Sequence, residues 1–279
     1  MKRHLTATFT AALLIACSGQ THPTTVSAHQ PATAPSEMLS MDDIRWQQLN
    51  PARGDKSPKA ATLWGNRQGE VATGFLVQFI DGFSSPPHIH NVSYRGVVIS
   101  GLVHNDDPQA AEMWMPAGSF WTQPKGEVHI TSARGAATTA YIEIDSGPYL
   151  VEPPANAFDS GERPVNVHES NIVWQSPSGM ATGENAPRQA YLWGNRAANQ
   201  LNGSLVELPA GFTGRISSRG TLRVVVIRGR LELAPGTSDV SPLAPGSYFG
   251  SLHPATHGLS ATTDTILYVR ARGSFDVSW

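Results

Sequence analysis

The feature that most constrains this 279-residue chain is that it repeats itself, with a spacing of about 128 residues. Residues 63–67 (LWGNR) recur unchanged at 192–196. Further matches keep the same order: 44–47 recurs at 172–175, 76–83 at 205–212 and 116–120 at 244–248. Such constant spacing over both halves predicts a duplicated folded unit, so we expect two similar domains.

The runs between these matches are typical of β-strands. The sequence contains 26 Gly and 21 Pro, which favour tight turns between short strands over long helices. β-branched and aromatic residues dominate several short segments that Gly, Pro or Asp bound: 74–79, 97–99, 140–144, 222–227 and 266–269. We therefore predict an all-β fold in which each repeat forms a sandwich or small barrel.

The N-terminus has the pattern of an export signal. Lys2 and Arg3 precede an apolar run too short to cross a bilayer, which is typical of a signal peptide. The run ends in LIAC at 14–17, which resembles the box of bacterial lipoproteins, in which the cysteine is acylated; Cys17 is the only cysteine of the chain. We expect an exported protein, anchored in the cell envelope by lipid on Cys17, on the periplasmic face of the outer membrane in a Gram-negative host. The alternative is a plain secretory signal.

Composition divides the rest of the chain. Residues 18–36 contain no Asp, Glu, Lys or Arg and are rich in Ser, Thr, Pro, Ala and Gln, as flexible tethers are. Pro-containing polar sequence separates the two repeats. We expect a signal peptide at 1–17, a tether at 18–38, the first domain at 39–150, a linker at 151–164 and the second domain at 165–279.

The charge balance limits the partners. Twenty basic residues against 22 acidic ones give a net charge of −2. This balance argues against nucleic acid as a partner and leaves the lipid anchor as the expected contact with a membrane.

Three histidines of the first repeat form a candidate metal site. His88 and His90 are two residues apart, so in an extended strand their side chains share one face. His129 follows a Pro-x-Gly turn at 124–126, which favours a third strand that returns to the same place. Three imidazoles that converge would hold one divalent metal ion, and the sequence does not distinguish iron, manganese and zinc.

These residues resemble the two cupin motifs, G-x5-H-x-H-x3,4-E-x6-G and G-x5-P-x-G-x2-H-x3-N. The glutamate position of the first motif holds Tyr94 or Arg95, and the asparagine position of the second holds Ala133. The mature chain also resembles the bicupin family called domain of unknown function 4437, through residues 86–108, 115–131 and 141–149. The resemblance implies two tandem cupin barrels, that is, RmlC-like double-stranded β-helix jelly rolls, with the three histidines at the mouth of the first.

Several neighbours are candidates for the chemistry of that site. Tyr94, in register with the missing glutamate, could orient or bind a ligand, or it could be an aromatic of the barrel wall. Glu127 shares a strand face with His129 and is a candidate general base. Arg95, Trp114 and Trp121 are candidates for the ligand pocket, although such aromatic residues are more often core. An ion held by three neutral imidazoles keeps its full charge, so we expect a small anionic organic ligand.

The second repeat lacks most of this set. Its counterpart of 88–90 reads ISSR at 216–219, and only His257 keeps the place of His129. One histidine holds a transition metal poorly. We expect a degenerate barrel, with Arg219 and His257 as remnants, that serves packing or forms a homodimer.

Three functions remain open. A metal-dependent enzyme would resemble three-histidine cupins that cleave carbon–carbon bonds in the manner of dioxygenases, or with zinc would hydrolyse or isomerise. A non-catalytic module would hold structural zinc, as resemblance to the cupin-like domain of a zinc-binding anti-sigma factor suggests, and would sense or bind a ligand. A scaffold that has lost its metal in both halves is the third hypothesis.

Overall fold

The computed structural model describes residues 32–279 apart from 177–185 and 235–241. The expected signal peptide, Cys17 and most of the tether therefore lie outside the described residues. Within the described part of the chain, no helix has the length and apolar character needed to span a membrane.

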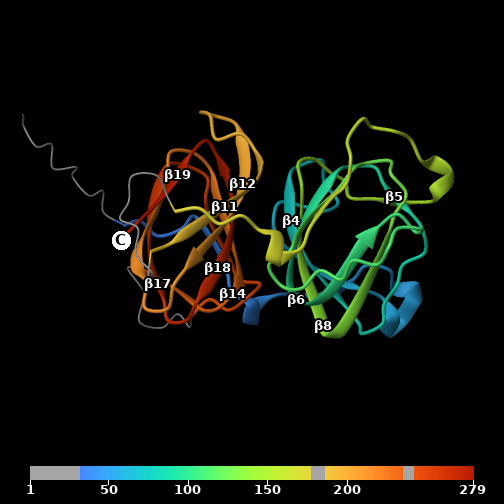
Figure 1. The fold of residues 1–279 in the computed structure, drawn as a ribbon, viewed down its shortest axis with the longest axis horizontal. Coiled ribbons are helices and arrows are strands. Elements are labelled where there is room, and N and C mark those ends of the chain that lie inside the picture. The colour runs from blue at the N-terminus through green and yellow to red at the C-terminus, as the bar shows by residue number, and fades with distance from the viewer. Residues whose placement is uncertain (1–31, 177–185, 235–241) are drawn as a thin grey trace, which may run out of the picture. The chain divides into compact units, whose positions relative to one another are not determined.

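The predicted all-β fold is confirmed, because strands carry almost all of the regular structure (Figure 1). The helices among the described residues are short 3-10 turns: η1 (Met41–Asp43), η2 (Pro51–Lys56), η3 (Pro154–Asn156) and η4 (Glu169–Asn171).

The N-terminal half is built on a seven-stranded antiparallel sheet. Its strand order is β10 (Val165–Val167), β7 (Phe120–Gln123), β6 (Tyr94–Asp106), β8 (Ile130–Ile144), β4 (Thr73–Phe79), β3 (Lys59–Trp64) and β2 (Gln47–Gln48). A two-stranded sheet, β5 (Ile89–His90) with β9 (Val151–Glu152), belongs to the same half. Apolar side chains that alternate along the large sheet form the core, which includes Phe75, Val77, Val98, Trp121 and Ile142.

The C-terminal half repeats this arrangement with two sheets. The six-stranded sheet has the order β1 (Glu37–Leu39), β16 (Tyr248–Ser251), β14 (Leu222–Arg228), β18 (Thr265–Arg272), β12 (Leu201–Leu208) and β11 (Arg188–Gly194). The four-stranded sheet has the order β15 (Leu231–Ala234), β17 (Ala255–Ala261), β13 (Thr213–Ser218) and β19 (Phe275–Ser278). Both sheets contribute to a single apolar cluster, with Val224, Leu267 and Val269 from the first and Ile216, Leu259 and Phe275 from the second.

The two halves exchange edge strands. β1 pairs with β16 of the C-terminal half, and β10 pairs with β7 of the N-terminal half. Figure 1 shows the first of these by colour, because the blue N-terminal segment runs among orange and red strands. Each exchanged segment is also fixed by a serine, Met41 N to Ser247 Oγ and Glu169 N to Ser119 Oγ, both at 3.0 Å. The sheets therefore cross the limits 39–150 and 165–279 that the sequence suggested for the two domains.

Reciprocal contacts join the halves. Glu143 of β8 is fully buried and bonds Arg270 of β18 at 3.0 Å and the hydroxyl of Tyr268 at 2.8 Å. The guanidinium of Arg95 stacks on Trp193 at 3.7 Å, and that of Arg223 stacks on Trp64 at 4.2 Å, so each half places an arginine on a tryptophan of the other. An apolar cluster with members from both halves surrounds these groups, including Leu76, Val97, Phe120, Leu205, Val225 and Tyr248.

Candidate metal centre

The structure brings together the three histidines that the sequence singled out. One ring nitrogen from each of His88, His90 and His129 lies within 4.8 Å of the other two. Backbone pairing explains this convergence: His88 and His129 exchange both of their N–H···O bonds at 3.0 Å, and His90 follows two residues later on the same face. In the described residues, this is the cluster of His, Cys, Asp or Glu side chains that is compact enough for a metal ion, and it contains no carboxylate.

Each imidazole is oriented by a backbone carbonyl. The Nδ1 atoms of His88, His90 and His129 lie 2.9, 2.8 and 3.2 Å from the carbonyl oxygens of Pro86, Leu150 and Glu127. A carbonyl accepts and never donates, so each Nδ1 carries the proton and each Nε2 keeps its lone pair. Second partners of this kind fix the tautomer and orientation of metal-binding histidines.

Burial keeps the three rings neutral. His90 and His129 are 2% and 1% exposed, whereas His88 is half-buried and opens the cluster to solvent. Burial, with the His88 ring nearby, lowers the pKa of His129 to about 3. Burial, with the charges of the other two rings, holds the pKa of His90 well below its usual value, and burial also lowers the pKa of His88. Neutral imidazole is the form that binds a metal.

Tyr94 lies at this centre, as its place in the motif suggested. Its hydroxyl is 3.4 Å from Nε2 of His129 and donates to Oδ1 of Asn105 at 2.9 Å. The same oxygen accepts the Thr131 hydroxyl at 2.8 Å, and Nδ2 of Asn105 donates to Gln123 at 2.9 Å. Burial raises the pKa of the Tyr94 hydroxyl, so it keeps its proton. No sequence motif pointed to Asn105 or Gln123, which become neighbours only when β6, β7 and β8 pair.

Sequence reasoning also missed Tyr149. Its ring stacks on His90 with centroids 4.3 Å apart, and its hydroxyl is 3.1 Å from Nε2 of His90. Residues 149–151 contact His90 in three ways, because Leu150 accepts from Nδ1 and Val151 pairs with the His90 backbone. Burial raises the pKa of the Tyr149 hydroxyl well above its usual value. Tyr149 belongs to the segment 141–149 that carried the family resemblance, and that was the only available signal.

Arg95 and Glu127 take positions outside the cluster. Arg95 follows Tyr94 in β6 and so points to the opposite face of the sheet, where it bonds Asp145 at 2.9 Å. It lines a cleft of about 560 Å³ there, but its guanidinium pairs with Glu143 and stacks on Trp193 at the junction between the halves. Glu127 contributes its carbonyl to His129, and its carboxylate lines a separate cleft with Phe158 and Arg163. Burial raises the pKa of that carboxyl.

The two tryptophans expected in the ligand pocket have other neighbours. Trp121 is 1% exposed and lies in the core, 6.5 Å from the Tyr94 ring. Trp114 donates to Glu112 at 2.9 Å and lies under the guanidinium of Arg134 at 3.8 Å. Trp121 is therefore a core residue, whereas Trp114 is half-buried and contacts charged side chains.

Among the described residues of the C-terminal half, His257 is the one potential metal ligand at the equivalent place. Both ring nitrogens of His257 have partners: Nδ1 bonds the Thr33 carbonyl at 2.9 Å and Nε2 bonds the Ser251 hydroxyl at 3.0 Å. Ile216 and Ser218 replace His88 and His90, and Arg219 is exposed. His257 is therefore a satisfied core histidine.

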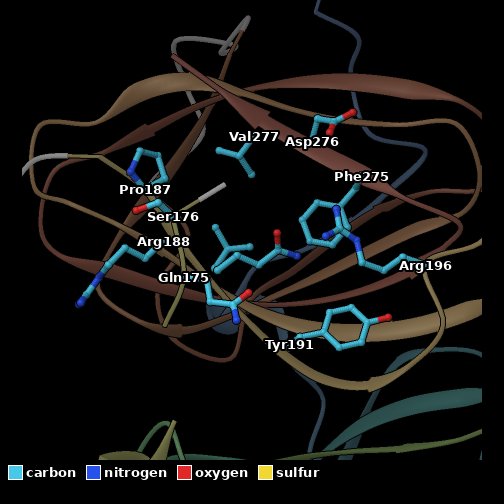
Figure 2. A pocket seen from close by; sticks show the side chains of 11 residues that line it. Gln175, Ser176, Pro187, Arg188, Tyr191, Arg196, Phe275, Asp276 and Val277 are labelled. Carbon is cyan, nitrogen blue, oxygen red and sulfur yellow. The ribbon is translucent and has the colours of Figure 1, made fainter. Parts of the chain in front are cut away.

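A different cavity does open in that half. Figure 2 shows it, with a volume of about 150 Å³, between the chain around Gln175 and Arg188 and the strand β19. Its described lining contains neither histidine nor cysteine, and Arg188, Arg196 and Asp276 are its exposed charges. It is distinct from the metal centre and gives no ligand set of its own.

A cupin-like fold with a three-histidine cluster defines the class of this protein. The family model named domain of unknown function (DUF4437) matches residues 37–278, so the chain belongs to that family. Among curated proteins, none matches.

Solved structures agree on the fold. A protein from Nostoc punctiforme described as a candidate dioxygenase is 14% identical, with a TM-score of 0.62 over 85% of this chain and 82% of its own. The oxalate decarboxylase of Lactobacillus farciminis in complex with formate is 11% identical, with a TM-score of 0.56 over 89% of both chains. Vicilin from hazelnut, Corylus avellana, is 11% identical, with a TM-score of 0.55 over 86% and 87%. At such identities the likeness shows the fold alone.

Proposed function

We propose that this protein binds one divalent metal ion through His88, His90 and His129 and uses it to bind and transform a small anionic organic ligand. The observation that carries the proposal is the common orientation of the three rings, in which a carbonyl bonds each Nδ1 and leaves the lone pair to Nε2. A metal ion would take the place of the Tyr149 hydroxyl at Nε2 of His90. Three nitrogen ligands on one side of an ion leave coordination positions for a ligand on the other.

The residues present fit such an ion. Imidazole nitrogens suit iron, manganese and zinc, and the low pKa of His129 means that binding need not displace a proton from that ring at neutral pH. When bound, the ion supplies Lewis-acid polarisation of its ligand, or oxygen chemistry if it is iron.

The surroundings favour an anion. The cluster brings no carboxylate to offset the charge of a divalent ion. Half-buried His88 marks the side from which the ligand enters. A candidate dioxygenase and an oxalate decarboxylase share the fold, which supports metal-dependent chemistry on small oxygen-containing substrates.

The first test is metal content. The full chain, purified in detergent without added metal, is compared with a His88→Ala, His129→Ala double variant by elemental mass spectrometry. We expect about one metal ion per chain in the natural sequence and none in the variant. No bound metal in either protein after reconstitution with iron, manganese and zinc would leave only the scaffold hypothesis.

The identity of the metal then separates enzyme from sensor. With iron or manganese, we expect oxygen uptake or product formation with diketones or aromatic acids that disappears in His88→Ala. Zinc that raises the melting temperature, without turnover of any anionic ligand tested, would instead assign the site to a structural or sensing role.

We further propose that the protein is exported and lipid-anchored at Cys17, on the basis of the apolar run and LIAC sequence at its N-terminus. Labelling of cells with a fatty-acid analogue should mark the natural protein and not Cys17→Ser. Release of the unlabelled natural protein into a soluble fraction would contradict the anchor.

A further inference from the structure

We propose that the hydroxyl oxygen of Tyr149 is the fourth protein ligand of the metal held by His88, His90 and His129. This inference rests on the proposed metal site and goes beyond it, since the sequence motif points to Tyr94 instead. Tyr149 lies in the segment after β8 and reaches the centre from the side of β9.

The distances suit a shared ion. Two donor atoms bound to one ion at about 2.1 Å are about 3.0 Å apart at a right angle and about 3.4 Å apart at a tetrahedral angle. The Tyr149 oxygen is 3.1 Å from Nε2 of His90, within that interval. An ion on the Nε2 lone pair therefore lies within bonding reach of this oxygen after a small adjustment of the side chain.

Hydrogen bonding distinguishes the two tyrosines. The Tyr94 hydroxyl donates its proton to Oδ1 of Asn105. Loss of that proton would leave the buried Asn105 oxygen with one hydrogen-bond donor fewer. In the described part of the chain, the hydrogen-bond partner of the Tyr149 hydroxyl is Nε2 of His90. A metal ion takes this nitrogen, so the Tyr149 oxygen must find a new partner, and the ion is beside it.

Coordination of the Tyr149 oxygen requires the loss of one proton. The O–H bond of Tyr149 breaks, its proton leaves to solvent, and the oxygen lone pair forms the bond to the metal. A cation next to the oxygen reverses the effect of burial, as it does for metal-bound water and thiols. The ion then carries one negative ligand, the role that glutamate has in the motif this sequence lacks.

The backbone around Tyr149 should become more rigid when this bond forms. His90 already holds residues 149–151 through the ring stack, the Leu150 carbonyl and the strand pair with Val151. A bond from the ion to Tyr149 would close a ring through His90 and this segment. Metal binding should therefore slow amide hydrogen exchange at 149–152 more than at β1 or β10.

Copper(II) is a suitable probe, because it binds nitrogen and oxygen ligands most tightly of the divalent first-row ions and gives a visible charge-transfer band with phenolate. The full chain, stripped of metal and loaded with one equivalent, is measured by absorption and resonance Raman spectroscopy, and copper content is determined on the same sample. We expect phenolate ring modes in the natural protein and in Tyr94→Phe, which is the matched control. Tyr149→Phe should keep copper, lose the band, and bind zinc at least about tenfold more weakly.

Three results would overturn the assignment. Stoichiometric copper without phenolate modes in the natural protein would remove the Tyr149 bond and leave the three-histidine site intact. Loss of the band in Tyr94→Phe alone would assign the ligand to Tyr94. If Tyr149→Phe does not fold, the spectra of the natural protein and of Tyr94→Phe still decide which oxygen binds the metal. Absence of copper from the natural protein would defeat the metal site itself and this inference with it, and the metal content distinguishes that failure from the others.

Discussion

The same backbone positions hold a polar centre in the N-terminal half and a hydrocarbon core in the C-terminal half. Strand register aligns Tyr94, Asn105 and Thr131 with Leu222, Leu233 and Leu259. The first three residues form a hydrogen-bonded network around the metal centre, whereas the three leucines pack in or against the apolar cluster of their half. The comparison shows that the same strand framework holds a fully polar set of side chains in one half and a fully apolar set in the other.

The two equivalent histidines illustrate the difference. His129 and His257 are both about 1% exposed and both pair across to the neighbouring strand. Nδ1 of His129 bonds the Glu127 carbonyl, and the Tyr94 hydroxyl 3.4 Å from its Nε2 gives its proton to Asn105. Both nitrogens of His257 are bonded, one of them to Thr33 of the N-terminal segment. His257 could bind a metal ion only by losing its hydrogen bond to Ser251, whereas His129 could offer its Nε2 lone pair directly.

Substitution of each equivalent histidine should have opposite consequences. We expect His129→Leu to abolish metal binding and to lower the stability of the metal-free protein by about 1 kcal/mol, because a similar volume fills the site but the hydrogen bond to the Glu127 carbonyl is lost. His257→Leu should keep the metal and lower the free energy of unfolding by about 2 kcal/mol, since two hydrogen bonds are lost and buried partners remain. Elemental analysis and urea unfolding check both; loss of metal in His257→Leu would erase the contrast.

At the junction, equivalent positions carry opposite charges, Glu143 in β8 and Arg270 in β18. Glu143→Gln removes the fully buried carboxylate beside Arg270 and leaves the guanidinium paired with Asp145 at 2.7 Å, so we expect destabilisation by about 2–3 kcal/mol in urea unfolding. The exposed pair of Arg134 and Glu112 is the control, and Glu112→Gln should change the urea midpoint far less than Glu143→Gln. Equal effects would show that the buried pair does not hold the halves together.

Asn105→Leu tests whether one member of the polar network can be replaced by its leucine counterpart while the other members stay. The Tyr94 and Thr131 hydroxyls lose their acceptor and Gln123 loses a donor, so we expect a cost of about 2–4 kcal/mol. Leu259→Met, a volume-conserving change in the other half, should cost less than about 1.5 kcal/mol. A neutral Asn105→Leu in thermal and urea unfolding would mean that the network is not coupled.

Acid should weaken the metal-free protein through the histidine centre. The pKa of His129 is about 3 in the folded protein and about 6.5 in the unfolded chain. As pH falls below 6.5, the unfolded chain therefore binds a proton at this ring, whereas the folded protein does not. Between pH 7 and 5 this ring alone lowers the free energy of unfolding by about 2 kcal/mol. His129→Leu should remove that part of the pH dependence; an unchanged pH profile of unfolding would contradict the shift.

Local sequence was enough to predict much of the molecule. Strand pattern, turn residues and the repeat predicted the all-β duplicated architecture, because alternation along a strand is a property of neighbouring residues. The spacing of His88 and His90 placed two rings on one face for the same reason, and the same alternation placed Arg95 opposite Tyr94.

Only the tertiary structure decided which residues complete each centre. Tyr149 reaches His90 from 59 positions away, Thr33 reaches His257 from 224, and β1 and β10 each join the sheet of the other half. No local pattern specifies such partners, because they depend on which strand edges meet after the halves have packed. The sequence by itself determined the framework and the three histidines of the candidate metal site. The packed chain determined their surroundings, since burial and hydrogen bonding between distant segments set which nitrogen and oxygen atoms remain free to bind a ligand.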